Sequence, residues 1–364
     1  MAKFCVFCGK KPENKTKEHI IPKWLIKLTG DEKREISLGL NFYDLASGDL
    51  YDIKNRLLSF QNFQFPACDN CNQKYSNFEA NTSVVIKKIL KEDYINESEI
   101  NQLLDWFDKV RIGLWLGSIT LDKIKDEVSP KFYINNRIGT KDRALYIYKL
   151  EENHNGINFH GFNTPAFQFV PSIFGLRINN FFFINYSIDN LLAERFGLPF
   201  YRHLDYEKNT NREIFEPMIG SNKIQTPILQ TVFPKPTLTL FQSILSINKL
   251  PEKFINEYVK NTMASEERSK ILYYDSLTKR LSFLEAGFEL RIDGKIISHS
   301  IHKFNGIVSL KVIEELENVI KFNHHKKISD KKKIAAIEKN RTFVLQFHKS
   351  VKKIMEELIK KDNS

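Results

Sequence analysis

The sequence has 364 residues, of which 42% are hydrophobic, 12% aromatic and 27% charged, the composition of a folded protein long enough for two or three domains. No run of about 18 apolar residues occurs, which excludes a membrane-spanning helix, and the N-terminus lacks the apolar core of a secretory signal, so we expect a cytoplasmic protein. The formal net charge of +11 favours polyanionic partners.

The first 82 residues predict short strands and turns. Residues 42–53 read FYDLASGDLYDI, and the Ser-Gly pair at their centre predicts a β-hairpin. A helix is expected after Cys71. Apolar residues at mixed spacings of three and four predict further helices over residues 83–93 and 98–126.

Between residues 131 and 240 the pattern changes to strands. Apolar and aromatic runs alternate with Gly, Asn and Pro, which indicates a β-rich region of a mixed α+β domain. The runs expected to form this region read RALYIYKL, GINFHGF, PAFQFV, GLRINNFFFINYSI, TPILQTVF and TLTLF. Beyond them, residues 250–262 and 265–283 predict helices, and residues 288–301 predict a second hairpin.

The C-terminus is expected to be helical and basic. Helices are predicted over residues 308–320 and about 330–361, the second with apolar residues on one side and lysines on the other. Residues 321–364 contain 13 Lys and Arg against 5 Asp and Glu. This surface is compatible with contact to a phosphate backbone and equally with the solvated face of a packing helix.

All four cysteines fall into two CxxC pairs, Cys5 with Cys8 and Cys68 with Cys71. In a chain without a secretory signal, paired CxxC segments indicate a tetrahedral zinc site and not disulfides. Four thiolates fill the coordination shell, so this zinc would be structural. The alternative of two unrelated redox or buried pairs is disfavoured because no cysteine is left over.

The 59 residues between the two pairs exceed the 15–20 that are usual in a zinc ribbon. The interval contains KTKEHIIP, with Glu18 and His19, and the second pair is followed directly by Asn72. The order CxxC, EHIIP, CxxCN resembles the zinc-bearing HNH endonucleases of the ββα-metal, treble-clef type. The resemblance covers residues 3 to about 80.

The resemblance implies a role for each of these residues. His19 would be the general base that deprotonates the attacking water, which suits an imidazole because its usual pKa is near 6.5. Glu18 and Asn72 would be ligands of a catalytic Mg²⁺ or Mn²⁺, since hard cations prefer oxygen ligands. Asn62, one residue away from the family's spacing, would hold the loop or the backbone of the catalytic histidine. Glu79 would either reach the metal or its surroundings, or be a solvated helix residue.

Lysines near His19 are candidates for phosphate contacts. Lys15, Lys17 and Lys23 flank the Glu-His pair, where their charge would face the nucleic-acid backbone. The zinc would clamp the strand that bears His19 against the helix that bears Asn72, because a unit this small cannot fix catalytic groups through its own core.

These patterns predict an α+β protein with a treble-clef ββα-metal nuclease domain over residues 1–82. Residues 83–364 would form a helical connector and a larger mixed α+β domain for recognition, dimerisation or regulation, with a helical tail over residues 308–364. The expected activity is metal-dependent cleavage of DNA, with bacterial restriction or anti-phage defence as a plausible setting. A homodimer is expected because one HNH unit cuts one strand, and a regulatory protein or ligand is a candidate partner of the C-terminal part.

Two other functions stay open. The same site does not by itself exclude RNA, since it acts on a backbone phosphate. A zinc module that binds nucleic acid or a protein without catalysis is the second alternative, although the presence of His19 and Asn72 argues against a decayed site.

Overall fold

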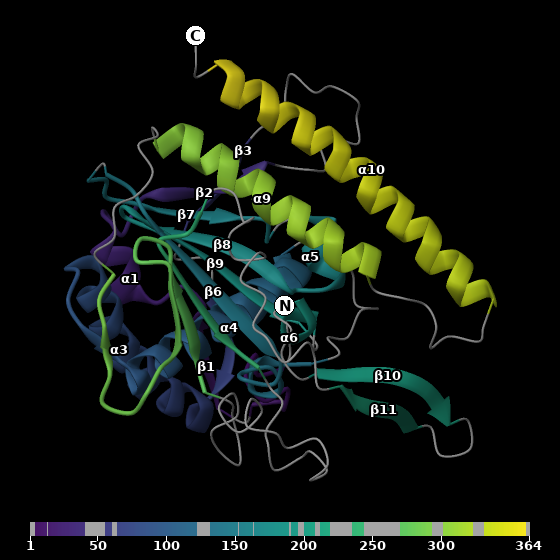
Figure 1. Ribbon diagram of the computed structural model, residues 1–364, viewed down its shortest axis with the longest axis horizontal. Coiled ribbons are helices and arrows are strands. Elements are labelled where there is room, and N and C mark those ends of the chain that lie inside the picture. Colours follow the sequence, from purple (N-terminus) through teal and green to yellow (C-terminus); the bar gives the residue numbers. More distant parts are fainter. Residues whose placement is uncertain are drawn as a thin grey trace.

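The computed structural model describes residues 4–12, 14–40, 55–59, 64–121, 132–151, 153–162, 164–188, 191–195, 200–207, 212–218, 235–243, 270–292, 301–322 and 331–361. Within these ranges the protein is a mixed α+β fold built on one large sheet between helices (Figure 1). None of the helices in the described ranges combines the length and the apolar character that a membrane crossing requires.

A seven-stranded antiparallel sheet forms the centre of the molecule. Its spatial order is β14-β13-β12-β6-β9-β8-β7. The strands are β6 (Asp142–Lys149), β7 (Ile157–His160), β8 (Ile173–Ile178), β9 (Phe181–Ile188), β12 (Leu238–Gln242), β13 (Leu272–Asp275) and β14 (Arg280–Phe283). Because helices cover both faces, β9 is buried over nearly its whole length and its sequence is an almost continuous apolar run.

Helices α4 (Glu97–Leu121) and α9 (Ile301–Phe322) cover opposite faces of this sheet. Neighbouring residues of a strand point to opposite faces, and β9 shows the division directly. The ring centroid of Phe183 lies 5.2 Å from that of Phe107 in α4, and that of Phe182 lies 4.6 Å from that of Phe304 in α9. The sheet is therefore the middle layer of a helix–sheet–helix arrangement.

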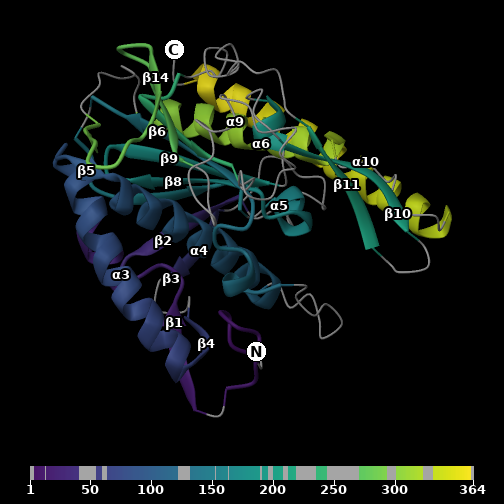
Figure 2. The same cartoon turned by 60° about the horizontal axis from the view of Figure 1, so that its bottom comes forward.

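Two further helices form outer layers (Figure 2). Helix α3 (Asp69–Leu90) packs on α4, and α10 (Lys331–Lys361) packs on α9. Helices α9 and α10 are antiparallel, since Gly306 near the start of α9 meets Ile359 near the end of α10. Val344 and Val351 are buried on the inner side of α10, which confirms the predicted apolar side of that helix.

The N-terminal segment adds two small sheets. Strand β1 (Lys15–His19) pairs with β4 (Gln64–Cys68), and β2 (Glu35–Leu40) pairs with β3 (Asn55–Ser59). Helix α1 (Lys23–Leu28) follows β1. The remaining elements are β5 (Ile95–Asn96), which pairs with β15 (Glu289–Leu290), the 3₁₀ turn η2 (Ile134–Asn136), α5 (Pro165–Phe169), α6 (Leu191–Arg195), and β10 (Phe200–Glu207), which pairs with β11 (Arg212–Met218).

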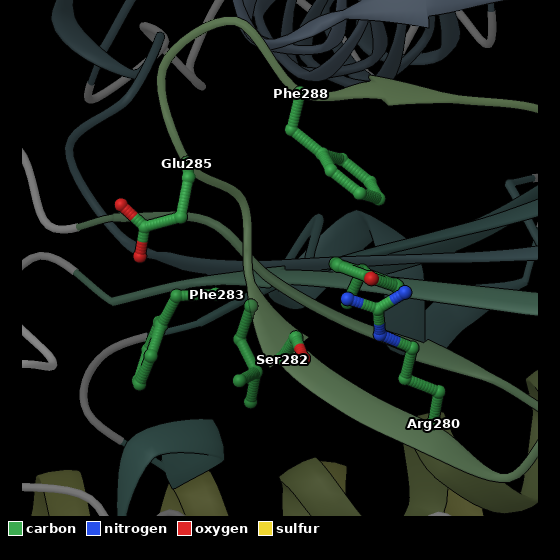
Figure 3. Close-up of a pocket in the computed structure, with 7 residues that line it drawn as sticks. Arg280, Ser282, Phe283, Glu285 and Phe288 are labelled. Carbon is green, nitrogen blue, oxygen red and sulfur yellow. The ribbon is translucent and has the colours of Figure 1, made fainter.

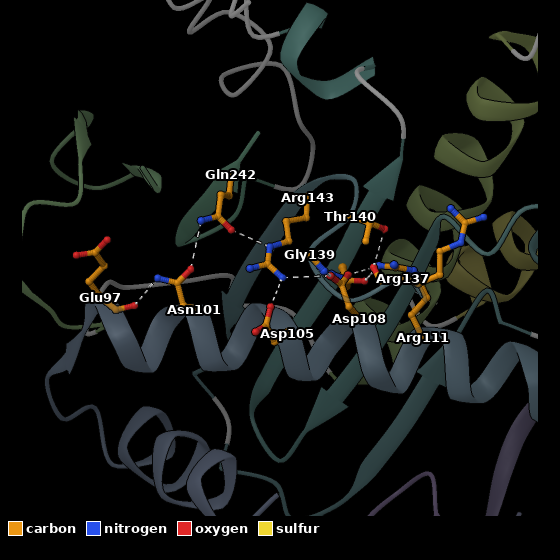
Figure 4. A network of polar contacts seen from close by, with 11 residues as sticks. Glu97, Asn101, Asp105, Asp108, Arg111, Arg137, Gly139, Thr140, Arg143 and Gln242 are labelled. Carbon is orange, nitrogen blue, oxygen red and sulfur yellow. Dashed lines mark hydrogen bonds and ion pairs between the residues drawn. The ribbon is translucent and has the colours of Figure 1, made fainter. Parts of the chain in front are cut away.

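A buried polar network joins α4 to the sheet (Figure 4). The guanidinium of Arg143 in β6 donates to Asp105 at 2.6 Å, to Asp108 at 3.1 Å and to Gln242 at 2.9 Å. Arg111 donates to Asp108 at 2.8 Å. Three of the four charged residues, Asp108, Arg111 and Arg143, are at most 1% exposed, so each charge depends on its partners to offset the loss of hydration.

Several predicted elements are confirmed and others are wrong. Helices α3, α4, α9 and α10 lie where helices were expected, but the segment PAFQFV is helix α5 and not a strand, because Pro165 occupies the first helical position and the Thr164 hydroxyl caps Phe167 N–H. The predicted helix over 265–283 is wrong where it is described: β13 and β14 form a hairpin whose turn is fixed by Asp275, which accepts hydrogen bonds from Thr278 and Leu277.

Other predicted segments lie outside the described residues. These are the whole hairpin over residues 42–53, the strand over 226–233, the helix over 250–262 and most of the hairpin over 288–301. One hydrophobic cluster contains buried residues from both predicted domains, from Cys5 to Val344.

Candidate functional site

The four cysteines converge although 59 residues separate the two pairs. Their Sγ atoms all lie within 4.8 Å of one another, and the Sγ atoms of Cys8 and Cys68 are 3.8 Å apart. A tetrahedron with Zn–S bonds of about 2.3 Å has edges of about 3.8 Å. The donor set and its spacing therefore fit a structural zinc ion held by Cys5, Cys8, Cys68 and Cys71.

Backbone geometry prepares each cysteine pair for a metal. The Gly9 N–H donates to the Cys5 carbonyl at 2.9 Å and the Cys5 N–H to the Lys10 carbonyl at 2.8 Å, which closes a tight turn around the first pair. Gly9 has φ +75°, and a Cβ there would lie 2.3 Å from the Tyr133 ring, so only glycine fits. The second pair lies where β4 ends and α3 begins.

Pairing of β1 with β4 brings the Glu-His pair to the same place. In the antiparallel register Lys15 faces Cys68 and His19 faces Gln64. The cysteine cluster thus lies at one end of the two-stranded ribbon and His19 at the other, and α3 follows directly from β4.

Glu18, His19 and Asn72 line a single open cavity of about 520 Å³ between β1, α1 and α3. Its other lining residues are Pro22, Lys23, Trp24, Ser76, Glu79, Ala80, Ser83, Val84 and Lys87. The structure therefore brings together three of the predicted catalytic residues from positions as far apart in the chain as 18 and 72. The fourth, Asn62, lies outside the described residues.

His19 is held by a neighbour across the ribbon. The side-chain amide of Gln64 lies 2.8 Å from Nε2 of the imidazole. Partial burial, together with the positive charges of Lys23 and Lys109, lowers the pKa of His19. The ring is thus kept neutral near pH 7, in the form that can accept a proton.

Glu18 shares a buried ammonium with Glu79. Lys109 of α4 is fully buried, and its Nζ lies 2.9 Å from Glu18 Oε1 and in direct contact with Glu79 Oε1. Burial raises the pKa of Glu18, and the charge of Lys109 opposes that shift. The pKa of Lys109 is raised, because the two carboxylates outweigh the desolvation that acts in the opposite direction.

Glu79 is not a solvated helix residue, since it is only 7% exposed. Its carboxylate accepts hydrogen bonds from the indole N–H of Trp24 at 3.0 Å and of Trp106 at 3.0 and 3.1 Å. Lys109 was not among the predicted site residues because it lies beyond the cysteine region. The signal in the sequence was a lysine inside the apolar helical run WFDKVRIGLW.

The three predicted phosphate-binding lysines differ in position. Lys23 lines the cavity and is exposed. Lys17 is exposed on β1, two residues before His19 and so on the same side of the strand. Lys15 faces Cys68 in the strand register. Lys87 of α3, which was not predicted, adds a second exposed cation to the cavity lining.

A second cavity, of about 390 Å³, opens at the β13–β14 edge of the large sheet (Figure 3). The Arg280 guanidinium lies 5.6 Å from the Phe288 ring centroid and 6.0 Å from that of Tyr273. These two rings are already stacked on each other at 5.5 Å. None of the predicted site residues lines this cavity.

Comparison of the chain with protein-family models, with curated proteins and with solved structures found no match in any of the three.

Proposed function

We propose that the protein is a metal-dependent endonuclease that hydrolyses phosphodiester bonds in DNA, with the HNH-like arrangement of its N-terminal segment as the catalytic unit. The observation that carries the proposal is the convergence of His19, Glu18 and Asn72 on one open cavity beside the four-cysteine cluster. A lone Glu-His pair on a strand has many structural explanations. The combination of such a pair with a cysteine cluster able to bind a metal, and with an amide oxygen donor on a helix, is much more specific for a nuclease site.

The residues of the cavity divide the chemistry between them. In the structure the amide nitrogen of Gln64 faces Nε2 of His19. When the amide oxygen takes that place and accepts from Nε2–H, the free Nδ1 of His19 is the atom that takes the proton of the attacking water. The amide donor and acceptor exchange by a half-turn of the Gln64 side chain. The exposed ammonium groups of Lys23 and Lys87 provide positive charge for the phosphates on either side of the scissile bond.

The donor set of the cavity also fits a hard divalent cation. Glu18 and Asn72 would hold Mg²⁺ or Mn²⁺ through carboxylate and amide oxygens. When bound, such an ion stabilises the negative charge that develops on the phosphate and the leaving oxygen. The role of the structural zinc is separate, because that ion would tie the turn of Cys5 and Cys8 to the end of β4 and the first turn of α3.

The proposal is tested by a cleavage assay on supercoiled plasmid with zinc-loaded protein and Mg²⁺ or Mn²⁺. We expect nicked and then linear DNA from the wild type, and a rate lower by about 10²–10⁴-fold for His19→Ala. Equal cleavage by both proteins would remove His19 from the mechanism. Structured RNA in a parallel reaction decides the substrate: cleavage of RNA with intact plasmid would replace DNA by RNA in the proposal, and cleavage of neither would overturn it.

A further inference from the structure

Lys109 of α4 approaches the proposed site from the larger part of the fold. Its side chain is fully buried and contacts both Glu18 of β1 and Glu79 of α3. A lysine is almost never fully buried unless it is paired, and here the partners are the two carboxylates that line the catalytic cavity. Lys109 is therefore part of the cavity's support and not of the general core.

The two carboxylates are bound in different ways. Both oxygens of Glu79 are occupied, Oε1 by Lys109 and Trp106 and Oε2 by Trp24 and Trp106. Glu18 is bound by Lys109 through Oε1 only, and its other oxygen has no hydrogen-bond partner among the described residues. Glu79 thus has no oxygen left for a ligand, whereas Glu18 keeps one in a side chain that faces the cavity.

The net charge of Glu18, Glu79 and Lys109 also supports Glu18 as the cation ligand and Glu79 as the anchor of Lys109. Two carboxylates and one ammonium leave a net charge of −1, which attracts a divalent cation while avoiding two unpaired carboxylates side by side. The ammonium itself is fixed from several sides: it lies 5.8 Å from the Phe7 ring centroid and 6.0 Å from that of Tyr75. Phe7 belongs to the first CxxC segment, so Lys109 also touches the zinc-binding turn.

Helix α4 holds Lys109 at a fixed depth. The preceding residue, Asp108, is bound to Arg111 and Arg143 in the network that joins α4 to the sheet. Four residues after Lys109, a Cβ on Gly113 would lie 2.7 Å from the Ile20 side chain, so the helix packs closely against the residue that follows the Glu-His pair. The backbone of α4 is thus fixed relative to both the sheet and β1.

We propose that Lys109 is a positioning residue of the nuclease site: anchored by Glu79, it orients the Glu18 carboxylate so that the free oxygen faces the catalytic cation. This inference rests on the proposed function, and it makes α4, outside residues 1–82, an essential support of the site. Groups that orient a metal-binding carboxylate typically contribute 10–100-fold to metal affinity or activity.

The test is calorimetric titration of zinc-loaded protein with Mn²⁺, which needs no nucleic acid and no turnover. Lys109→Met alone leaves two buried carboxylates without a counter-charge and can prevent folding. The double variant Lys109→Met/Glu79→Gln avoids this, because it removes one positive and one negative charge and keeps the trio at −1. We expect its Mn²⁺ affinity to fall by about 10–100-fold.

Two further variants make the outcome specific. Lys88→Met removes a different ion pair between α3 and α4, the one with Glu99 at 2.6 Å, and is expected to bind Mn²⁺ like the wild type. Glu18→Gln is expected to abolish binding. If Glu18→Gln abolishes Mn²⁺ binding but the double variant binds Mn²⁺ with wild-type affinity, the role of Lys109 is overturned while the cation site stands. Unchanged affinity with Glu18→Gln would overturn the cation site and the proposed function with it.

Discussion

Helix α4 carries buried charges on two sides, and the two sides differ in access. Toward the sheet, Asp108, Arg111 and Arg143 form a network in which each side chain is almost completely buried. Toward the N-terminal segment, Lys109 joins Glu18 and Glu79, and both carboxylates line an open cavity. The residue types are similar on both sides, so buried charge alone does not indicate function. The cavity side differs because one Glu18 oxygen has no hydrogen-bond partner among the described residues, and the proposed cation site rests on that oxygen.

The largest difference in stability between the N-terminal side and the sheet side is expected when a zinc ligand is replaced. Cys68→Ser should abolish zinc binding, and structural zinc contributes about 10–16 kcal/mol in small zinc domains. Hydrogen exchange should then show loss of protection in β1 and β4, while β6 and β9 stay protected because they pair with each other and with β12 and β8 in the large sheet. Metal analysis of the wild type should give about one zinc per chain. A chain without bound zinc would contradict the metal assignment.

On the sheet side, Asp108→Asn should destabilise the fold. The substitution leaves Arg111 and Arg143 buried with less compensating charge, which typically costs about 3–5 kcal/mol. Denaturant unfolding measures the loss, and activity per folded molecule should fall much less than in His19→Ala, because Asp108 does not line the cavity and acts on it only through the position of α4. If Asp108→Asn abolishes activity but unfolds with wild-type stability, the sheet side of α4 serves function and the assignment of the two sides is wrong.

Two histidines extend the same contrast. His19 lines the cavity, whereas His160 is enclosed between β7 and α9, bonded to Ser309 Oγ at 2.7 Å. Burial, assisted by the charge of Arg177, lowers the pKa of His160 to about 3. Below about pH 6.5 the unfolded chain binds a proton at this histidine that the folded chain does not. The free energy of unfolding therefore decreases as the pH is lowered from about 6.5 toward 3.

We therefore expect the fold to lose about 2 kcal/mol through His160 between pH 6.5 and 4.5. His160→Asn should show a correspondingly shallower pH dependence of the unfolding free energy, measured by denaturant titration at each pH. Identical slopes for the two proteins would show that His160 is protonated in the folded state.

The sequence made the cysteine cluster and the long helices predictable because their signals are local and regular. Paired CxxC segments have few interpretations, and the apolar side of α10 repeats over many turns. The helix α5 was missed because Thr-Pro capping outweighed an aromatic run that favours a strand. The β13–β14 hairpin was missed because its turn depends on the side chain of Asp275.

Within the candidate site, the sequence predicted only the residues of the motif, which lie on β1 and at the start of α3. His19, Glu18 and Asn72 are close to the cysteines in sequence, so the motif identifies them together. Lys109 lies 91 residues from Glu18, and nothing local in the sequence of α4 indicates which of its charges turns toward the cavity. That choice depends on how α4 packs between α3 and the sheet.

The central claim is that His19 acts as the base in an open cavity, and chemical rescue tests it most directly. In His19→Gly the cavity gains room for a free imidazole, and the rate of plasmid nicking in Mg²⁺ should rise with added imidazole from a level about 10²–10⁴-fold below the wild type. The unfolding free energy and zinc content should stay close to those of the wild type. Nicking by His19→Gly at the wild-type rate without imidazole would contradict the account.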